Sequence, residues 1–332
     1  MKLFAPNNLS QRHPEFTPLK DPQVTSEIVA LLEQQYDLTS LNKICVIRGP
    51  NISSQNFKID TTWFLKSRPK EAREKMLSEA RLTFALSELG QKVPRIIRSS
   101  NGELVSLYED RCWVLYEFQE GNYFSGQGNE LQAAAEAFGE LSLAAINLFP
   151  RSEIDTELSG LAELLGRETK YSDLAQLCAT HRQTILKNLK NVEEHRDLLS
   201  GACVPVHLDY HPMNLLMNED GVPCIVDLEH LKPYPVVIGL GFAAFKLIRE
   251  AMVGKALEPA PAVAIWLRGW QKSFPADRFD STDLGLGARC RILQLIQMIL
   301  DAALNRDDDR FNYDLEKQIL SLYEAEIIFD PT

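Results

Sequence analysis

The sequence has little of what marks several classes of protein. It contains no run of about 18 apolar residues, so a membrane-spanning helix is not expected. Its six cysteines among 332 residues are scattered, with no C-x-x-C pair, and several lie in apolar strand-like runs, which predicts reduced thiols in a reducing compartment. The first residues lack the apolar core of a signal peptide. These absences together predict a cytoplasmic protein.

The chain also lacks an excess of basic residues. It has 35 Lys+Arg against 46 Asp+Glu, a net charge of −11, and therefore no sign of the basic stripe of a nucleic-acid-binding protein. Residues 1–121 are nearly neutral, with 16 basic and 15 acidic side chains, whereas residues 122–332 hold 19 and 31. The first part would tolerate an anionic nucleotide better, and the second a cationic substrate. A solvated acidic surface explains the same numbers.

The order of predicted elements indicates two domains. Residues 1–22 are polar and rich in proline and asparagine, which predicts a loose arm. A helix is expected from about residue 25, with Ser26 as its cap, followed by short β-type runs and one helix at 70–89. Glycines between 121 and 128 break this pattern, and the later sequence is mainly helical. We therefore predict an α+β fold with an arm at 1–22, a β-rich domain at 23–121 and a helical domain at 122–332.

One segment predicts the chemistry of phosphoryl transfer. His207, Asp209 and Asn214 fit the pattern H-x-D-x-x-x-x-N, and Asp227 ends an apolar run thirteen residues after Asn214. Residues 218–221 predict a hairpin turn that returns Asp227 to Asn214. Such a reaction needs one carboxylate facing the attacking hydroxyl and oxygen ligands for Mg²⁺. The pattern predicts Asp209 as the base and Asn214 and Asp227 as Mg²⁺ ligands. A loop and strand that carry polar residues by chance would read the same way.

Two charged residues of the β-rich part suit a nucleotide site. Lys66 ends a strand-like run, and Glu79 lies in the helix that follows. A lysine of this kind reaches the α- and β-phosphates of ATP, and a helix glutamate holds it in place. Taken singly, each residue would be read as a solvated surface charge. Their order ahead of Asp209 favours the nucleotide site.

The remaining contacts with a nucleotide are predicted less specifically. The turn before residue 55 has one glycine and no G-x-G-x-x-G, so Ser54 and Asn56 would offer donors to the phosphates. A plain hairpin turn fits this stretch equally well. The backbone from Glu117 to Gln119 enters the predicted linker and would bond the edge of the adenine ring.

These motifs together resemble the aminoglycoside phosphotransferase and choline kinase-like family, over about residues 40–250. That family has a protein-kinase-like fold of a small β-rich lobe and a larger, mainly helical lobe. The segment from His207 to Leu216 is similar to its H-G-D-x-x-x-x-N-x-L, and Ile225 to Glu229 to its I-D-x-E. The resemblance implies an ATP-dependent, Mg²⁺-dependent kinase of small hydroxyl compounds. It also implies that Glu229 helps the metal or the substrate.

The sequence departs from the family pattern at three places. Leu208 replaces the usual glycine, Leu141-Ser142 replaces a Leu-His, and Gly241 stands where an aspartate usually braces the catalytic loop. The alternative is therefore a catalytically weak nucleotide-binding protein or scaffold on the same fold. A protein kinase is disfavoured, because no D-F-G or A-P-E follows the catalytic segment.

The acceptor is not specified by a motif. Amino alcohols, hydroxy amino acids, sugars and aminoglycosides fall within the range of the resembled family, and neither nucleic acid nor a membrane is expected as a partner. Trp266 and Trp270 are expected to pack in the core. Asp301 and the acidic run 307–309 are candidate partners for an amine, or solvated helix-end residues.

Overall fold

The computed structural model describes residues 3–4, 15–47, 55–150, 158–274, 278–306 and 311–330, with the side chains of 311–313 excepted. The chain divides into two compact units. The β-rich unit comprises Asn8–Phe124 and Met213–His230, and the helical unit comprises the rest. The sequence-based division assigned residues 213–230 to the helical domain. In the structure these residues belong to the β-rich unit, because their strand Leu215–Met217 pairs with Asn122–Tyr123.

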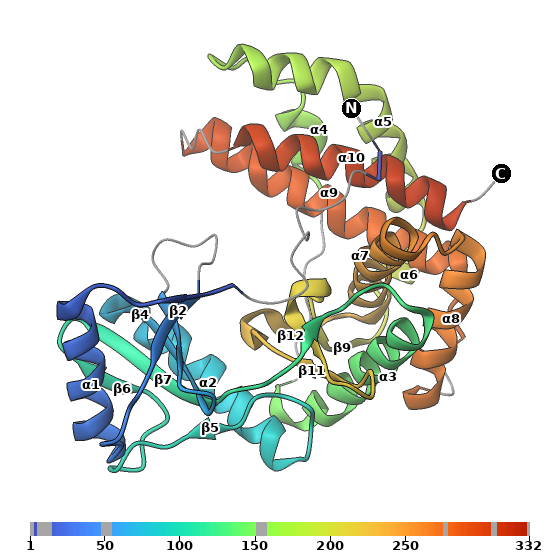
Figure 1. Ribbon diagram of the computed structural model, residues 1–332. Coiled ribbons are helices and arrows are strands. Elements are labelled where there is room, and N and C mark those ends of the chain that lie inside the picture. The colour runs from blue at the N-terminus through green and yellow to red at the C-terminus, as the bar shows by residue number, and fades with distance from the viewer. Residues whose placement is uncertain are drawn as a thin grey trace. The chain divides into compact units, whose positions relative to one another are not determined.

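An antiparallel sheet forms the centre of the β-rich unit (Figure 1). Its strands follow the order β1-β2-β3-β4-β7-β5, with β6 also paired to β7. Their bounds are β1 Phe16–Pro18, β2 Ile44–Ile47, β3 Gln55–Ile59, β4 Trp63–Pro69, β5 Ile96–Ile97, β6 Ser106–Tyr108 and β7 Arg111–Glu117. The strands expected from the sequence are present, and β1 adds one within the segment predicted to be a loose arm.

The two faces of this sheet have different coverings because side chains alternate along each strand. Leu65 on β4 packs with Phe57 and Leu115 in a core that α1 (Pro22–Tyr36) covers. The opposite face carries Phe64 and Lys66, and α2 (Arg73–Glu88) packs on part of it. The charged residues of β4, Lys66 and Arg68, therefore lie on the α2 side of the sheet.

Helix α1 begins earlier than its sequence pattern predicts. The carboxylate of Asp21 accepts hydrogen bonds from the backbone N–H groups of Gln23 and Val24, and Pro22 occupies the first helical position. Asp21 is thus the cap, and the expectation for Ser26 was wrong. An aspartate followed by proline is a strong helix start, and the Ser26 hydroxyl instead donates to the carbonyl of Pro22 within the first turn.

A hairpin carries Asp227 to its place. Strands β10 (Leu215–Met217) and β11 (Pro223–Ile225) pair antiparallel, and β10 also pairs with β8 (Asn122–Tyr123). The turn between them is closed by Asn218, whose side chain accepts a hydrogen bond from the Val222 N–H at 2.8 Å, and by Gly221 at φ 73°. The predicted hairpin is present, and a short 3₁₀ helix at Leu228–His230 follows it.

The helical unit contains long helices and one two-stranded sheet. Strand β9 (Cys203–His207) pairs antiparallel with β12 (Leu231–Pro235). Trp266 and Trp270 are fully buried, as the sequence predicts, and both pack on Phe138. The helices are α3 Gly128–Ala145, α4 Leu161–Leu164, α5 Ser172–Glu194, α6 Arg196–Leu199, α7 Val236–Lys255, α8 Pro259–Ser273, α9 Ser281–Asn305 and α10 Phe311–Phe329. Within the described ranges, none of them combines the length and apolarity that crossing a membrane would require.

Candidate functional site

The β-rich unit encloses a cavity of about 320 Å³. Eight of the residues predicted to form the site line it: Asn56, Lys66, Glu79, Glu117, Gln119, Asn214, Asp227 and Glu229. Ser54, the ninth candidate for this unit, lies outside the described residues. Side chains far apart in the sequence thus meet at one hollow, with charged groups and aromatic groups both in its wall.

Lys66 joins two carboxylates at this cavity. Its Nζ lies 2.8 Å from Oε1 of Glu79 and 2.9 Å from Oδ1 of Asp227. Lys66 and Glu79 are both buried, and β4 and α2 present them to each other. Burial alone would lower the pKa of Lys66, but the two carboxylates outweigh it, and the pKa is raised. The ammonium group therefore stays charged in a site that excludes most water.

The backbone around Asp227 turns sharply where β11 ends. Asp227 has φ 62°, a left-handed conformation that a non-glycine residue adopts at a cost. The N–H of Val226 donates to the carbonyl of Asn214 at 3.0 Å, which holds the two segments together. The Asp227 side chain is 42% exposed, so one edge of its carboxylate faces solvent. The turn thus directs a carboxylate into the cavity wall.

Glu229 is held by cations. Its Oε2 lies 2.7 Å from Nη2 of Arg68 and 3.4 Å from Nζ of Lys75, and its Oε1 lies 3.2 Å from Nε2 of His230. The hydrogen bond from His230, followed by those charges, holds the pKa of Glu229 well below its usual range despite partial burial. The pKa of Arg68 is raised in turn, because the effect of Glu229 outweighs that of burial, which alone would lower it. Glu229 is therefore an ionised structural partner of Arg68.

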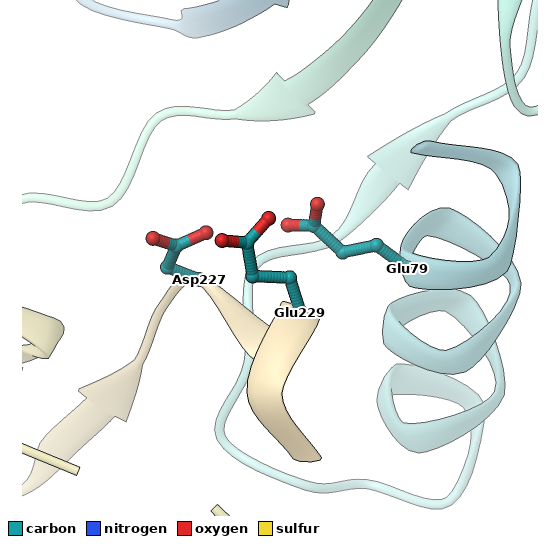
Figure 2. Close-up of side chains that lie close together, drawn as sticks. All are labelled: Glu79, Asp227 and Glu229. Atoms are coloured by element: carbon teal, nitrogen blue, oxygen red, sulfur yellow. The ribbon is translucent and has the colours of Figure 1, made fainter. Parts of the chain in front are cut away.

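Three carboxylates gather where a cation could be bound. Ligand oxygens of Glu79, Asp227 and Glu229 lie within 4.8 Å of one another, and Figure 2 shows the three side chains converging from α2, the end of the hairpin and the 3₁₀ helix. Hard oxygen donors of this kind, with the amide of Asn214 nearby in the cavity wall, suit Mg²⁺. Since Lys66 and Arg68 neutralise part of this charge, the donor set fits a divalent ion that arrives with an anionic ligand.

The far wall of the cavity is built on the end of β7. The N–H of Glu117 donates to the carbonyl of Arg95 at 2.8 Å, and the N–H of Phe118 donates to that of Thr62 at 2.7 Å. Gln119 bonds the Glu117 carbonyl through its side-chain amide at 3.4 Å. The sequence predicts that this backbone bonds the adenine edge. Two of its three N–H donors and the carbonyl of Glu117 are engaged within the protein.

Asp209 and His207 belong to the helical unit. The N–H of Asp209 donates to Nδ1 of His207 at 3.2 Å, and His207 itself is buried against the ring of Tyr210. The hydroxyl of Tyr210 donates to the carbonyl of Ala134 on α3, which fixes the loop to the helix. The Asp209 carboxylate is 44% exposed, with Nε2 of His211 at 3.5 Å from its Oδ2. The loop is thus rigid while its carboxylate stays accessible.

Sequence reasoning missed Arg68 and Phe16, which line the cavity, and Lys75, which contacts Glu229. Arg68 lies two positions after Lys66 on β4, so the alternation of a strand places both on one face. That signal was available for Arg68. Lys75 and Phe16 gave none, because their contacts depend on elements distant in sequence.

Known proteins resemble this chain in fold. A spectinomycin phosphotransferase solved with ADP and spectinomycin is 16% identical, covers 92% of this chain and 97% of its own, and gives a TM-score of 0.63. An aminoglycoside phosphotransferase from Alicyclobacillus acidocaldarius is 14% identical, with 97% of each chain covered and a TM-score of 0.58. An ethanolamine kinase from Plasmodium vivax is 11% identical, with 92% and 89% covered and a TM-score of 0.57. At identities this low, the TM-scores and coverage show the shared α+β, kinase-like fold and nothing further.

No curated protein sequence matches the chain significantly. The model of the phosphotransferase enzyme family matches residues 45–277, which is more than half of the sequence. That range contains the Lys66–Glu79 pair, the loop of Asp209 and the hairpin that ends at Asp227. The chain belongs to the phosphotransferase enzyme family, whose members are kinases that act on hydroxyl groups.

Proposed function

We propose that this protein is an ATP-dependent, Mg²⁺-dependent kinase that transfers the γ-phosphoryl group to a hydroxyl of a small molecule. The observation that carries the proposal is the buried ion pair of Lys66 and Glu79 with Asp227 at 2.9 Å from the same ammonium group, in the wall of one cavity. A lysine fixed in this way is the group that positions nucleotide phosphates. The similar solved proteins are named for spectinomycin, kanamycin and ethanolamine, so aminoglycosides and amino alcohols are the candidate acceptors.

Each residue has a role in this proposal. Lys66 binds the phosphates and Glu79 orients it, while Asp227 and Asn214 hold Mg²⁺. Bound Mg²⁺ would neutralise charge on the phosphate oxygens. Glu229, already bonded to Arg68, keeps that cation beside the phosphate end of the cavity. Asn56 and the carbonyls of the segment after β7 contact the nucleotide.

Asp209 is the proposed general base. Its carboxylate accepts the proton of the acceptor hydroxyl as the oxygen attacks the γ-phosphorus, and ADP leaves. His207 acts through the backbone: its Nδ1 accepts the Asp209 N–H and so sets the direction of that residue. A proton acceptor positioned in this way typically contributes ~10²–10⁴-fold to the rate.

The test compares Asp209→Asn with Asp220→Asn, a change in the exposed hairpin turn. A panel of hydroxylated metabolites is screened with Mg-ATP, and ADP release is measured. Asp209→Asn should lower kcat by ~10²–10⁴-fold on the best acceptor and leave the Kd of Mg-ATP nearly unchanged. Retention of near wild-type kcat would exclude Asp209 as the base.

A second candidate is a nucleotide-binding protein with weak catalysis. The observation that favours it is Gly241, buried in α7 where the resembled family carries its bracing aspartate. The same screen separates the two. Tight Mg-ATP binding with no ADP release above the Asp209→Asn background, across the whole panel, would establish the second reading.

A further inference from the structure

The N-terminal strand β1 contributes to the cavity although it lies outside the family match, which begins at residue 45. Phe16 on β1 lines the cavity, together with Ile47, its direct partner on β2. The pairing of β1 with β2 holds this ring in place through three residue pairs. An arm that the sequence predicts to be loose is therefore a structural part of the site.

Phe16 meets a second ring from the opposite end of the β-rich sequence. The rings of Phe16 and Phe118 pack edge to face with centroids 5.6 Å apart, and both residues line the cavity. The ammonium group of Lys58 on β3 lies 3.7 Å from the centroid of the Phe118 ring and 4.7 Å from that of Phe16. A cation over two ring faces fixes their positions, because it is attracted by both quadrupoles. The result is a rigid aromatic corner.

The corner and the charged cluster differ in chemistry. Lys66, Arg68 and the carboxylates supply the groups that phosphates and Mg²⁺ require, whereas Phe16, Phe118 and Ile47, the strand partner of Phe16, bring apolar side chains to the cavity wall. Bases stack on aromatic side chains without regard to their hydrogen-bonding pattern. A nucleotide therefore has one complementary orientation, with its phosphates at the cluster and its base at the corner.

We propose that β1 forms the nucleobase wall of the cavity, with Phe16 and Phe118 contacting the base and Lys58 holding both rings. This inference rests on the proposed nucleotide-binding function. It adds that residues before the family match determine nucleotide affinity, and that this contribution is made to the base and not to the phosphates.

The experiment separates the two ends of the ligand. Adenosine and inorganic tripolyphosphate with Mg²⁺ are titrated separately, alongside Mg-ATP, into the full chain. The variants are Phe16→Leu, which keeps apolar volume on β1 without a ring, Phe118→Leu and Lys66→Ala. Thr17→Ala is the matched control, because its side chain leaves the opposite side of the same strand. Thermal unfolding verifies that each variant is folded.

Loss of a stacking ring should lower the affinity for adenosine and for Mg-ATP by about tenfold and leave the affinity for tripolyphosphate unchanged. Lys66→Ala should weaken the binding of tripolyphosphate and Mg-ATP and leave the binding of adenosine unchanged. Thr17→Ala should leave the binding of all three ligands unchanged. If Phe16→Leu binds adenosine like the wild type while Lys66→Ala weakens tripolyphosphate, the β1 inference is wrong and the nucleotide site stands. If no variant changes the binding of any of the three ligands, the proposed function itself fails.

Discussion

The carboxylates of Asp227 and Glu229 lie two positions apart in the sequence but have different neighbours, so they differ in their availability to a ligand. Glu229 is surrounded by Arg68, Lys75 and His230 and is 15% exposed, so its charge is already used within the protein. Asp227 has Lys66 as its cationic partner, is 42% exposed, and sits on a left-handed backbone that directs it into the cavity wall. The resemblance assigned both to the metal. The geometry favours Asp227 as the ligand and Glu229 as the support of Arg68.

Removing the Asp227 charge should therefore remove most of the Mg²⁺ dependence of ATP binding. Asp227→Asn is the better variant, because asparagine adopts a left-handed backbone more readily than alanine does. We expect a loss of at least ~10–100-fold in Mg²⁺-dependent affinity, and a smaller loss for Asn214→Ala, whose amide is neutral. Titration of Mg²⁺ at fixed ATP measures the order, with Asp220→Asn as control. Equal affinities for wild type and Asp227→Asn would sink the assignment.

The Glu229 cluster predicts a pH dependence of stability. The folded pKa of Glu229 is depressed, so its contribution is fully present above its unfolded pKa, about 4.3, and is lost as pH falls below that value. At pH 7, Glu229→Gln removes the nearest charged partner of Arg68 and should lower the free energy of unfolding by ~1–3 kcal/mol. Its Tm should lie below that of the wild type at pH 7, with the gap narrowing towards pH 3.

Glu74→Gln is the control for that measurement. Glu74 pairs with Arg73 at 3.2 Å, but its side chain is 84% exposed, so its Tm difference should be small at every pH. A Glu229→Gln gap that stays constant from pH 7 to pH 3 would mean that the charge of Glu229 contributes nothing to stability.

At the scale of elements, Gly241 shows why the sequence departs from the pattern it resembles. Gly241 lies in α7 where that helix crosses α9, and a Cβ at this position would meet the carbonyl oxygen of Leu284 and lie 2.8 Å from the N of Ala288. A Cβ at Gly287 of α9 would in turn meet the backbone carbonyl of Val237. The two helices pack backbone to backbone, and no side chain fits between them. An aspartate is therefore excluded here by packing.

This close crossing yields a prediction with an unusual sign. Glycine to alanine inside a helix normally stabilises by about 1 kcal/mol, but Gly241→Ala should destabilise by ~1–3 kcal/mol because helix backbone must shift. Gly241→Asp should be worse and should not raise activity. Gly128→Ala in α3, where a Cβ would lie an ordinary 3.4 Å from Ile265, is the control. Chemical denaturation measures all three, and a stabilised Gly241→Ala would refute the argument.

Much of the element pattern was predictable from local sequence. The strands around Lys66, the helix of Glu79, the Asn218–Gly221 turn and the α+β class follow from alternation, periodicity and turn residues. Local pattern missed β1, because a three-residue edge strand forms only through its partner β2. It placed the cap of α1 at Ser26, where the stronger Asp21-Pro22 start was overlooked.

The site was predictable as a set of residues but not as a network. The motif spacing named Lys66, Glu79, Asn214 and Asp227, which all line the cavity. The motif spacing did not show that Arg68 pairs with Glu229, since 161 positions separate the two residues. Contacts across such separations depend on tertiary packing, which no local periodicity reports.

For the whole molecule, the uneven charge bears on the acceptor. The helical unit contains both Asp209 and a hollow of about 500 Å³. Its charged lining is balanced between Glu163, Asp301, Arg167 and Arg291, and its other polar residues are Tyr234, Gln294, Gln297 and Asn305. Asp301 accepts hydrogen bonds from Asn305 and Arg306, and the acidic run 307–309 lies outside the described residues. The acidic excess of this part of the chain is therefore not concentrated in the hollow.

Balanced charges with many amide and hydroxyl groups suit a polyhydroxylated ligand, because such groups bond hydroxyls without demanding a counter-charge. We therefore predict that the acceptor is a neutral polyol or sugar, or an alcohol bearing an amine, in preference to a hydroxy acid. The screen uses matched sets: glucose, glucosamine and gluconate, and glycerol, serinol and glycerate. Within each set, kcat/KM should be lowest for the acid, by about tenfold, because the two arginines of the hollow are matched by two carboxylates and leave no excess cation for an anion. Replacing Gln297 with Leu should raise the KM of the best acceptor without changing the Kd of Mg-ATP, which ties the preference to this hollow. If the acid is the best member of either set, the acidic composition is a property of the surface and has no bearing on the acceptor.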